Sequence, residues 1–133
     1  NRSILADPRD SKMKKLINDE VKHRQWFRPF APSILREKVH EWFEDDVSSP
    51  YMTHVLKWRS NKRKLVPAVV HYDNTARLQT VTIKDNKWYY NFLRDWEKIS
   101  GVPILLKIPL KVLFLYAQHF PREKRTQCPQ NSN

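Results

Sequence analysis

Glycine and cysteine are the scarcest residues of the sequence, with one of each among 133. Glycine-rich phosphate loops of the Walker or dinucleotide type need several glycines at fixed spacing, so Gly101 alone excludes both. Cys128 alone can form neither an internal disulfide nor a cysteine metal cluster. The sequence also lacks an apolar run of membrane length and a secretory signal, so we expect a cytoplasmic protein with no membrane partner.

Acidic residues are few beside the basic ones: 25 Lys and Arg stand against 14 Asp and Glu, a net charge of +11. Such an excess indicates an anionic partner, which could be a nucleic acid, a phosphorylated small molecule or an anionic surface. The hydrophobic content of 40% and the five tryptophans supply a core, which argues against disorder over the whole length. The chain has the length of one domain or a part of one, and because it begins with Asn1 in place of Met we expect a piece of a longer protein.

The spacing of apolar residues predicts a mixed α/β domain in which helices pack on a small sheet. Helices are expected over 11–22 after an Asp10 cap, over about 34–43 after a Ser33 cap, and from Asp85 to a stop at Gly101. Strands are expected over 51–58, 66–72, 76–83 and 102–106. The core-facing residues of the last helix are expected to be Trp88, Tyr89, Phe92, Leu93, Trp96 and Ile99.

Three cations surround two aromatic residues just after the first predicted helix: Lys22, Arg24 and Arg28 lie beside Trp26 and Phe27. A proline-bounded turn that holds several cations suits phosphate or carboxylate, because Arg offers a planar fork for two oxygens and Lys a point charge. The alternative is a solvated face on which the aliphatic stems cover apolar rings. Spacing alone leaves both interpretations open.

Arg77 lies on a predicted strand within an otherwise apolar region. An isolated buried charge is costly, so the guanidinium needs a partner, which could be a ligand phosphate or Asp73. His71 precedes Asp73 by two residues, but no histidine pair in the chain has zinc-ligand spacing with a third ligand nearby, so no metal site is predicted. A Ser3–His71–Asp73 triad has no support from its context.

Five stretches of the chain carry a family resemblance: RSILADPR over 2–9, VKHRQWFRPFAP over 21–32, SPYM over 49–52, VPAVVHYDNTARLQTV over 66–81 and GVPILL over 101–106. Together they resemble the C-terminal region of the O-carbamoyltransferases of the nodulation-protein and antibiotic-biosynthesis type. The resemblance implies a YrdC-like α/β domain over 1–106. In that family an actin-like ATPase-type domain precedes it, and this N-terminal domain holds the metal and the acceptor alcohol.

The resemblance also implies a reaction and a site. The C-terminal domain would convert carbamoyl phosphate and ATP, with Mg²⁺, into carbamoyladenylate, and this chain without the N-terminal domain is expected to be inactive. The catalytic cations implied are Lys22, Arg28 and Arg77, and the substrate-binding residues implied are Arg2, Arg24, His71, Asp73 and Thr75. Cations aimed at phosphoryl and carbamoyl oxygens would stabilise the charge that develops during adenylation, so no protein nucleophile is required.

Two positions depart from the family pattern. Asn74 replaces a glycine, and because asparagine tolerates left-handed backbone the turn is expected to survive. After Leu106 the family continues with Asn-Thr-Ser-Phe-Asn and a later Glu-Pro-Ile segment, whereas this chain has Lys107 and a different sequence. We therefore predict that 107–133 is a divergent tail, disordered or read in a shifted frame.

Two other functions stay open at this point. The net charge, a basic loop over 57–64 and a basic tail permit a nucleic-acid-binding module, although the sequence has no RNA-binding fingerprint. A nonfunctional fragment is the third reading, because the family pattern is lost after residue 106.

Overall fold

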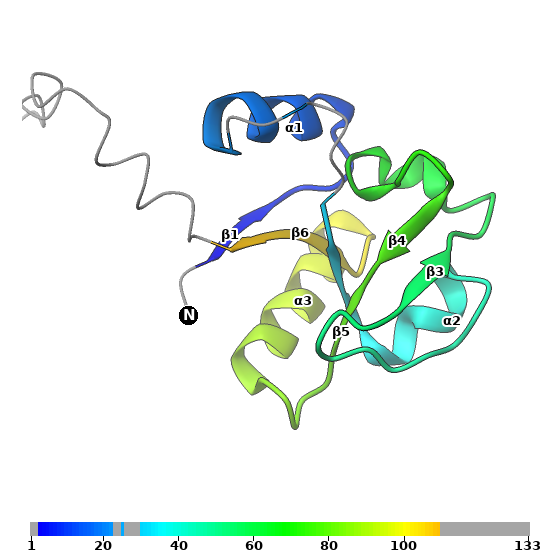
Figure 1. Ribbon diagram of the computed structural model, residues 1–133. Coiled ribbons are helices and arrows are strands. Elements are labelled where there is room, and N and C mark those ends of the chain that lie inside the picture. Colours follow the sequence, from blue (N-terminus) through cyan, green and yellow to red (C-terminus); the bar gives the residue numbers. More distant parts are fainter. Residues whose placement is uncertain (1–2, 23–24, 26–29, 110–133) are drawn as a thin grey trace, which may run out of the picture.

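The central element of the fold is a four-stranded mixed sheet in the order β1-β6-β2-β5. A computed structural model describes residues 3–22, 25 and 30–109. The strands are β1 (Ser3–Ala6), β2 (Pro32–Leu35), β5 (Gln79–Val81) and β6 (Ile104–Pro109). β2 runs parallel to β5, while β6 is antiparallel to both of its neighbours. This arrangement, shown in Figure 1, confirms the expected mixed α/β class in its α+β form.

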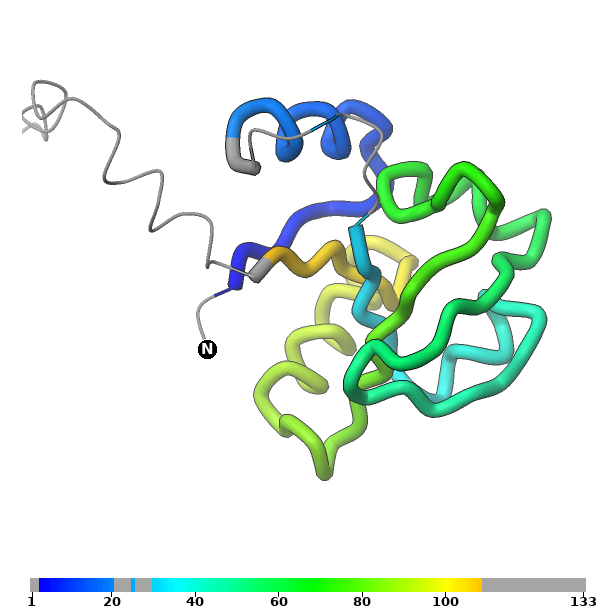
Figure 2. The backbone as a smooth tube through the Cα atoms, in the orientation of Figure 1, coloured from blue at the N-terminus to red at the C-terminus, as the bar shows by residue number. Residues whose placement is uncertain are grey.

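The register of the sheet decides which polar side chains share a face. Ser33 lies opposite Gln79 on one side and opposite Leu105 on the other. Lys107 lies two residues beyond Leu105 on β6 and opposite Leu5 on β1. Because side chains alternate along a strand, all five share one face of the sheet. Figure 2 shows how β1 and β6, far apart in the sequence, run side by side.

Helix α3 (Lys87–Ser100) covers this face of the sheet. Its buried residues Tyr89 and Leu93 pack with Leu35, Val81 and Leu105 in a small apolar core. The opposite face carries the larger core, which includes Ile34, Leu106, Trp42, Phe43 and Trp58. In Figure 1, α1 (Ser11–Leu16) and α3 accordingly lie on opposite sides of β1 and β6.

A second, two-stranded sheet joins the edge of the domain. It pairs β3 (Val55–Lys57) with β4 (Thr75–Arg77) in antiparallel fashion, with Val55 opposite Arg77. Leu78 is fully buried at the bend between β4 and β5, so the chain passes directly from this sheet into the central one. The remaining elements are α2 (Val39–Trp42) and the 3-10 turns η2 (Arg36–Lys38), η3 (Arg63–Leu65) and η4 (Pro67–Val69).

The predicted helix over 11–22 is present, with a change of geometry part-way. The Asp10 carboxylate accepts a 2.8 Å hydrogen bond from the amide of Lys12, which confirms the predicted cap. The α-helix then ends at Leu16, and a π-helix, η1 (Ile17–Lys22), continues it.

The predicted helix over about 34–43 is correct only in its second part, where η2 and α2 lie, and one predicted strand is absent. The segment after Ser33 begins as a strand and not as a helix, because Pro32–Leu35 is buried on both faces and a strand in that position reads as a continuous apolar run. The absent strand is the one predicted over 66–72. Pro67 instead opens the 3-10 turn η4, a position that suits a residue with no amide hydrogen.

The predicted strands over 51–58, 76–83 and 102–106 differ mainly in extent. The first shortens to β3, because the chain forms a loop up to residue 54. The second divides into β4 and β5 at the buried Leu78. The third is longer than predicted and shifted toward the C-terminus, so β6 passes through the expected domain boundary at 106. The boundary itself stays a prediction.

The last predicted helix was correct in type but not in its apolar face. Asn86, and not Asp85, is its cap, and its side-chain oxygen accepts from the Tyr89 amide at 3.0 Å. Gly101 ends it with a φ of 74°, as expected for a left-handed stop. Only the stripe toward the sheet is buried, so Trp88 is 69% exposed and Ile99 is 83% exposed. In the described part of the chain, no helix has the length and apolarity needed to cross a bilayer.

Candidate functional site

The turn before β4 is built as the sequence predicts. Asn74 adopts a left-handed φ of 63°, a conformation that glycine adopts readily and asparagine tolerates. The Asn74 amide donates to the His71 oxygen at 3.0 Å, and the His71 amide donates to the Thr75 oxygen at 2.9 Å. These two bonds close the turn and deliver the chain into β4.

Asp73 is engaged by its own turn. Its Oδ1 accepts hydrogen bonds from the Thr75 hydroxyl at 2.6 Å and the Thr75 amide at 3.2 Å. The hydroxyl bond is the main reason that the pKa of Asp73 is lowered. Asp73 and Thr75 are therefore already paired with each other, and their observed role is to shape the turn.

His71 is half-buried and faces a lysine from another element. Its Nδ1 lies 3.4 Å from the Thr75 hydroxyl, and its Nε2 is buried with no hydrogen-bond partner among the described residues. Burial lowers the pKa of His71, the charge of Lys14 on α1 lowers it further, and the charge of Asp73 opposes both. Burial also lowers the pKa of Lys14. Burial and the charge of Lys14 therefore both favour the neutral form of His71.

Arg77 points outward from β4 and is anchored by a backbone oxygen. Its Nε donates a 2.7 Å hydrogen bond to the Met52 carbonyl. No ion pair joins it to Asp73 in the described part of the chain, so the structural ion pair considered from the sequence is not formed. Among the described residues, the two terminal nitrogens of the exposed Arg77 guanidinium have no hydrogen-bond partner, so they are available to bind a ligand.

Hydrogen bonds to β5 hold the loop over 49–54, which contacts Arg77. The Ser49 amide donates to the Thr80 hydroxyl at 2.8 Å, and the Thr80 amide donates to the Ser49 oxygen at 3.0 Å. The Ser49 hydroxyl oxygen accepts from the Thr53 amide at 3.0 Å. Met52, at the top of this loop, has a left-handed φ of 58°. The Met52 carbonyl that binds Arg77 therefore belongs to a loop held in place by several hydrogen bonds.

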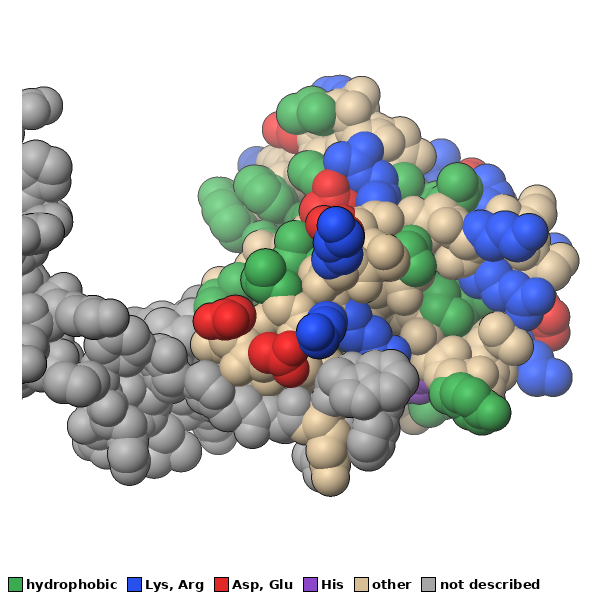
Figure 3. All heavy atoms as spheres, turned by 90° about the horizontal axis from the view of Figure 1, so that it is seen from above, with side chains coloured by type: hydrophobic (Ala, Val, Ile, Leu, Met, Phe, Trp, Pro, Cys, Tyr) green, Lys and Arg blue, Asp and Glu red, His purple; other side chains and the backbone are tan. Residues whose placement is uncertain are grey.

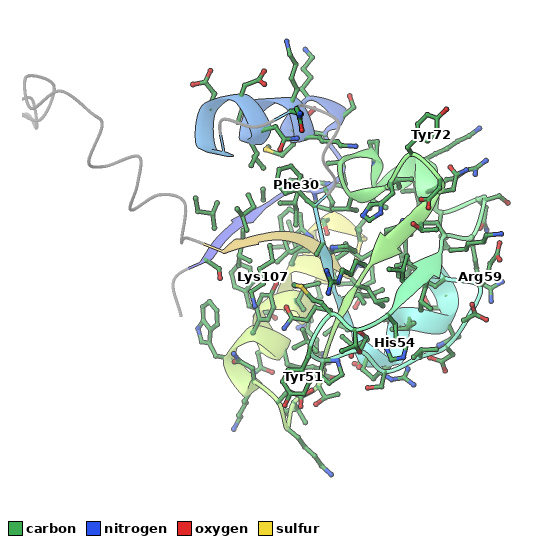
Figure 4. The ribbon with its side chains drawn as sticks, viewed as in Figure 1. Phe30, Tyr51, His54, Arg59, Tyr72 and Lys107 are labelled. Carbon is green, nitrogen blue, oxygen red and sulfur yellow. The ribbon has the colours of Figure 1, made fainter. Side chains whose placement is uncertain are left out.

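A cavity of about 380 Å³ opens beside the same loop. Its walls are Pro50, Tyr51, Gln79, Thr80, Val81, Asp85, Asn86, Tyr89 and Lys107. A smaller cavity of about 180 Å³ adjoins it and shares Asn86, Tyr89 and Lys107. Figure 4 labels Lys107 on the sheet and Tyr51 in the loop near the start of α3.

A chain of polar contacts crosses the floor of the larger cavity. Lys107 Nζ donates to Gln79 Oε1 at 3.1 Å, and the Ser33 hydroxyl donates to the same oxygen at 3.3 Å. Gln79 Nε2 donates to the Pro50 oxygen at 3.2 Å. Burial raises the pKa of Tyr89 to about 12, with a smaller opposing effect from the Ser33 hydroxyl. Tyr89 is thus a neutral phenol at physiological pH.

Sequence reasoning did not select these cavity residues. Two signals were present in the sequence. Gln79 lies two residues after Arg77, on the same face of the predicted strand over 76–83, and Lys107 places a charge next to an apolar run. The meeting of β5, β6 and α3 could not be deduced from spacing.

The expected convergence of Lys22, Arg28 and Arg77 is not tested. Arg2, Arg24 and Arg28 lie outside the described residues, as does the side chain of Lys22. The backbone of Lys22 closes the π-helix η1. Of the three expected catalytic cations, Arg77 alone has a described side chain.

The basic loop over 57–64 lies on another part of the surface. Figure 3 shows Lys and Arg side chains gathered on the right, on the side that carries β3 in Figure 1. Arg59 Nε donates to the His40 oxygen at 3.0 Å, and the Lys62 ammonium lies 5.0 Å from the centre of the Trp42 ring. Arg59 and Lys62 thus make contacts within the domain.

Comparison with known proteins identifies the family. The profile of the carbamoyltransferase C-terminus matches residues 1–112. The chain belongs to the carbamoyltransferase C-terminal family. The matched region continues past Lys107, so it includes all of β6.

The relatives are much longer than the chain. The nodulation protein NolNO of Sinorhizobium fredii is 50% identical over 109 residues, which cover 80% of this chain and 16% of the relative. Nodulation protein U of Bradyrhizobium diazoefficiens is 39% identical over 104 residues, 78% of this chain and 18% of the relative. The uncharacterized protein sll1178 of Synechocystis is 37% identical, covering 84% of this chain and 21% of the relative. The chain thus spans about a fifth of the length of these relatives.

Proposed function

We propose that this family member is the substrate-activating part of an O-carbamoyltransferase, which binds carbamoyl phosphate and ATP and forms carbamoyladenylate. The overall reaction consumes carbamoyl phosphate, ATP and one water molecule, and it releases phosphate and pyrophosphate as carbamoyladenylate forms. A partner domain of the actin-like ATPase type would then pass the carbamoyl group to the hydroxyl of a small-molecule alcohol. Mg²⁺ would accompany ATP, and the reaction would take place in the cytoplasm.

One observation carries the proposal: Arg77 and Lys107 approach the same polar loop from two strands. Arg77 is held by the Met52 oxygen, and Lys107 lies in a cavity walled by Pro50 and Tyr51 of that loop. One cation in the wall of the cavity and a second on the loop that borders it suit a ligand with several phosphoryl oxygens. The charge that develops on those oxygens during adenylation would be stabilised by cations already in place.

The test compares two arginines with the same anchoring. Arg77 and Arg59 are both exposed, and each donates from Nε to a backbone oxygen, at 2.7 and 3.0 Å. ATP and carbamoyl phosphate binding to the 133-residue chain would be measured by calorimetry for Arg77→Ala and Arg59→Ala. We expect Arg77→Ala to weaken binding about tenfold or more and Arg59→Ala to leave it unchanged. Equal affinity for ATP and carbamoyl phosphate in both variants would remove Arg77 from the site.

The nucleic-acid alternative is the less favoured proposal, because the basic loop over 57–64 uses Arg59 and Lys62 in local contacts. Binding to duplex RNA with a steep salt dependence would favour it.

A further inference from the structure

The Tyr89 hydroxyl is a buried polar group without a well-formed hydrogen bond. Tyr89 is 6% exposed and its hydroxyl is enclosed; the Ser33 hydroxyl lies near enough to lower the pKa of Tyr89 slightly, but no hydrogen bond of good geometry reaches the Tyr89 oxygen from the described residues. The residue lines both cavities beside Lys107. An enclosed hydroxyl without a good hydrogen bond costs free energy, so such a group at the wall of a cavity requires a structural reason.

Lys107 is a half-buried cation without a carboxylate partner. Its Nζ donates to Gln79 Oε1 at 3.1 Å and lies 5.5 Å from the centre of the Tyr89 ring, and no ion pair involves it within the described part of the chain. The one carboxylate in the wall is Asp85, and its Oδ2 accepts the Thr82 hydroxyl at 2.6 Å. The ammonium therefore keeps donors for an anion.

The start of α3 adds to the positive potential. The helix has 14 residues, and Asn86 and Trp88 at its N-terminal end line the smaller cavity. The positive end of a helix dipole favours an anion in the first turn. This end of the helix lies beside the buried hydroxyl of Tyr89 and the ammonium of Lys107, which line the same cavity.

We propose that Lys107 and Tyr89 form a phosphoryl-binding subsite between β6 and the N-terminus of α3. Lys107 supplies the charge, and the Tyr89 hydroxyl donates to a phosphoryl oxygen. The inference rests on the proposed function for the identity of the phosphoryl compound, which is ATP or carbamoyl phosphate.

Gln79 is a positioning residue between this subsite and Arg77. Its Oε1 accepts from Lys107 and its Nε2 donates to the Pro50 oxygen, so the amide orientation is fixed at both ends. Pro50 belongs to the same loop as Met52, whose carbonyl accepts a hydrogen bond from Arg77. Gln79 therefore links Lys107 to the loop whose Met52 carbonyl holds Arg77.

The experiment uses the 133-residue chain and three probes: inorganic phosphate, ATP and carbamoyl phosphate. NMR titrations would follow the backbone amides of Tyr89 and Lys107 in the unchanged chain and in Lys107→Gln, Tyr89→Phe and the control Lys98→Gln. Lys98 is an exposed lysine near the other end of α3. We expect Lys107→Gln to weaken phosphate binding about tenfold and Lys98→Gln to change nothing.

Tyr89→Phe is included as a second variant because it should fold even if Lys107→Gln does not. It keeps the ring and removes a hydroxyl that makes no well-formed hydrogen bond among the described residues, so the variant should be about as stable as the original. Its phosphate affinity should nevertheless fall several-fold, a change that a purely structural tyrosine would not cause. Unchanged phosphate affinity in both Lys107→Gln and Tyr89→Phe, or no binding of any probe, overturns the subsite.

The probes separate the two phosphoryl compounds. Loss of ATP affinity alone in Lys107→Gln assigns the subsite to ATP, and loss of carbamoyl phosphate affinity alone assigns it to carbamoyl phosphate. The proposed function has its own readout, carbamoyladenylate formation by the chain joined to its partner domain. Phosphate binding that depends on Lys107 without any carbamoyladenylate would retain the subsite and refute the proposed function.

Discussion

Arg77 on β4 donates a 2.7 Å hydrogen bond from Nε to the backbone oxygen of Met52, which ties the guanidinium to the loop over 49–54. The bond fixes the direction of the side chain and leaves its terminal nitrogens toward solvent. Arg59 makes the same kind of bond to His40 on the other side of the domain.

The two arginines should have similar stability effects and different binding effects. Arg77→Ala and Arg59→Ala each lose one exposed side chain–backbone bond, so each should reduce the free energy of unfolding by about 1 kcal/mol or less. Urea denaturation measures this. A loss several times larger in Arg77→Ala would mean that its weaker ATP binding reflects a disrupted loop.

The left-handed turn at Asn74 should discriminate between alanine and glycine. Asn74 has a φ of 63°, which costs a residue with Cβ about 1–2 kcal/mol unless it is asparagine or aspartate. Asn74→Ala should therefore lower the free energy of unfolding by about 1 kcal/mol, while Asn74→Gly should change it little. Thermal or urea unfolding would show the difference, with the exposed Asn61→Ala as control. Equal stability of the alanine and glycine variants would contradict the prediction.

The pKa of His71 should respond in opposite directions to its two charged neighbours. Lys14→Gln removes a positive charge, so the pKa of His71 should rise, and Asp73→Asn removes a negative charge, so it should fall. NMR titration of the imidazole protons measures both shifts. Shifts of the same sign would show that Lys14 and Asp73 do not act on His71 through their charges.

The same burial of His71 predicts a loss of stability in mild acid. Unfolding exposes a histidine of ordinary pKa, about 6.5, while the folded pKa is lower, so the unfolded chain binds more protons between the two values. The contribution of His71 is fully present above about pH 6.5 and is lost as the pH falls through the folded pKa. His71→Gln should reduce this loss, and His54→Gln, at an exposed histidine, should not.

Local signals in the sequence predicted the ends of elements better than their type. Asp10 and Gly101 act through their own side chain or lack of one, so their roles as helix start and stop were correct. The run beginning at Ser33 was read as a helix because its apolar spacing fits one, but its burial on both faces comes from β5 and β6. These pairings join residues far apart in the sequence, so they could not be deduced from the segment alone.

The candidate site was predictable only where one segment forms it. The turn from His71 to Thr75 could be anticipated, because its bonds join residues at most four apart. The meeting of Lys107 with Tyr89 could not, because their contact depends on the packing of α3 against β6. Lys107 was taken as the first residue of a divergent tail, although the strand β6 includes it.

Ser49 and Thr80 together hold the loop that carries the Met52 carbonyl. Both residues are buried, the Ser49 amide donates to the Thr80 hydroxyl at 2.8 Å, and the Ser49 hydroxyl oxygen accepts from the amides of Thr53 and His54 at 3.0 and 3.2 Å. Ser49→Ala leaves two amides without their acceptor, and Thr80→Val keeps the shape while leaving one amide without its acceptor. Each should cost about 1–3 kcal/mol of unfolding free energy.

Hydrogen exchange in these two variants would locate the effect. Faster exchange should be confined to the amides of Ser49, Thr53 and His54, while the amides of α3 remain protected. The exposed Ser60→Ala serves as control. If the loop loosens, the Met52 carbonyl no longer holds Arg77, so ATP affinity should fall even though neither Ser49 nor Thr80 bears a charge. A loosened loop with full ATP affinity would mean that Arg77 reaches its ligand without the loop.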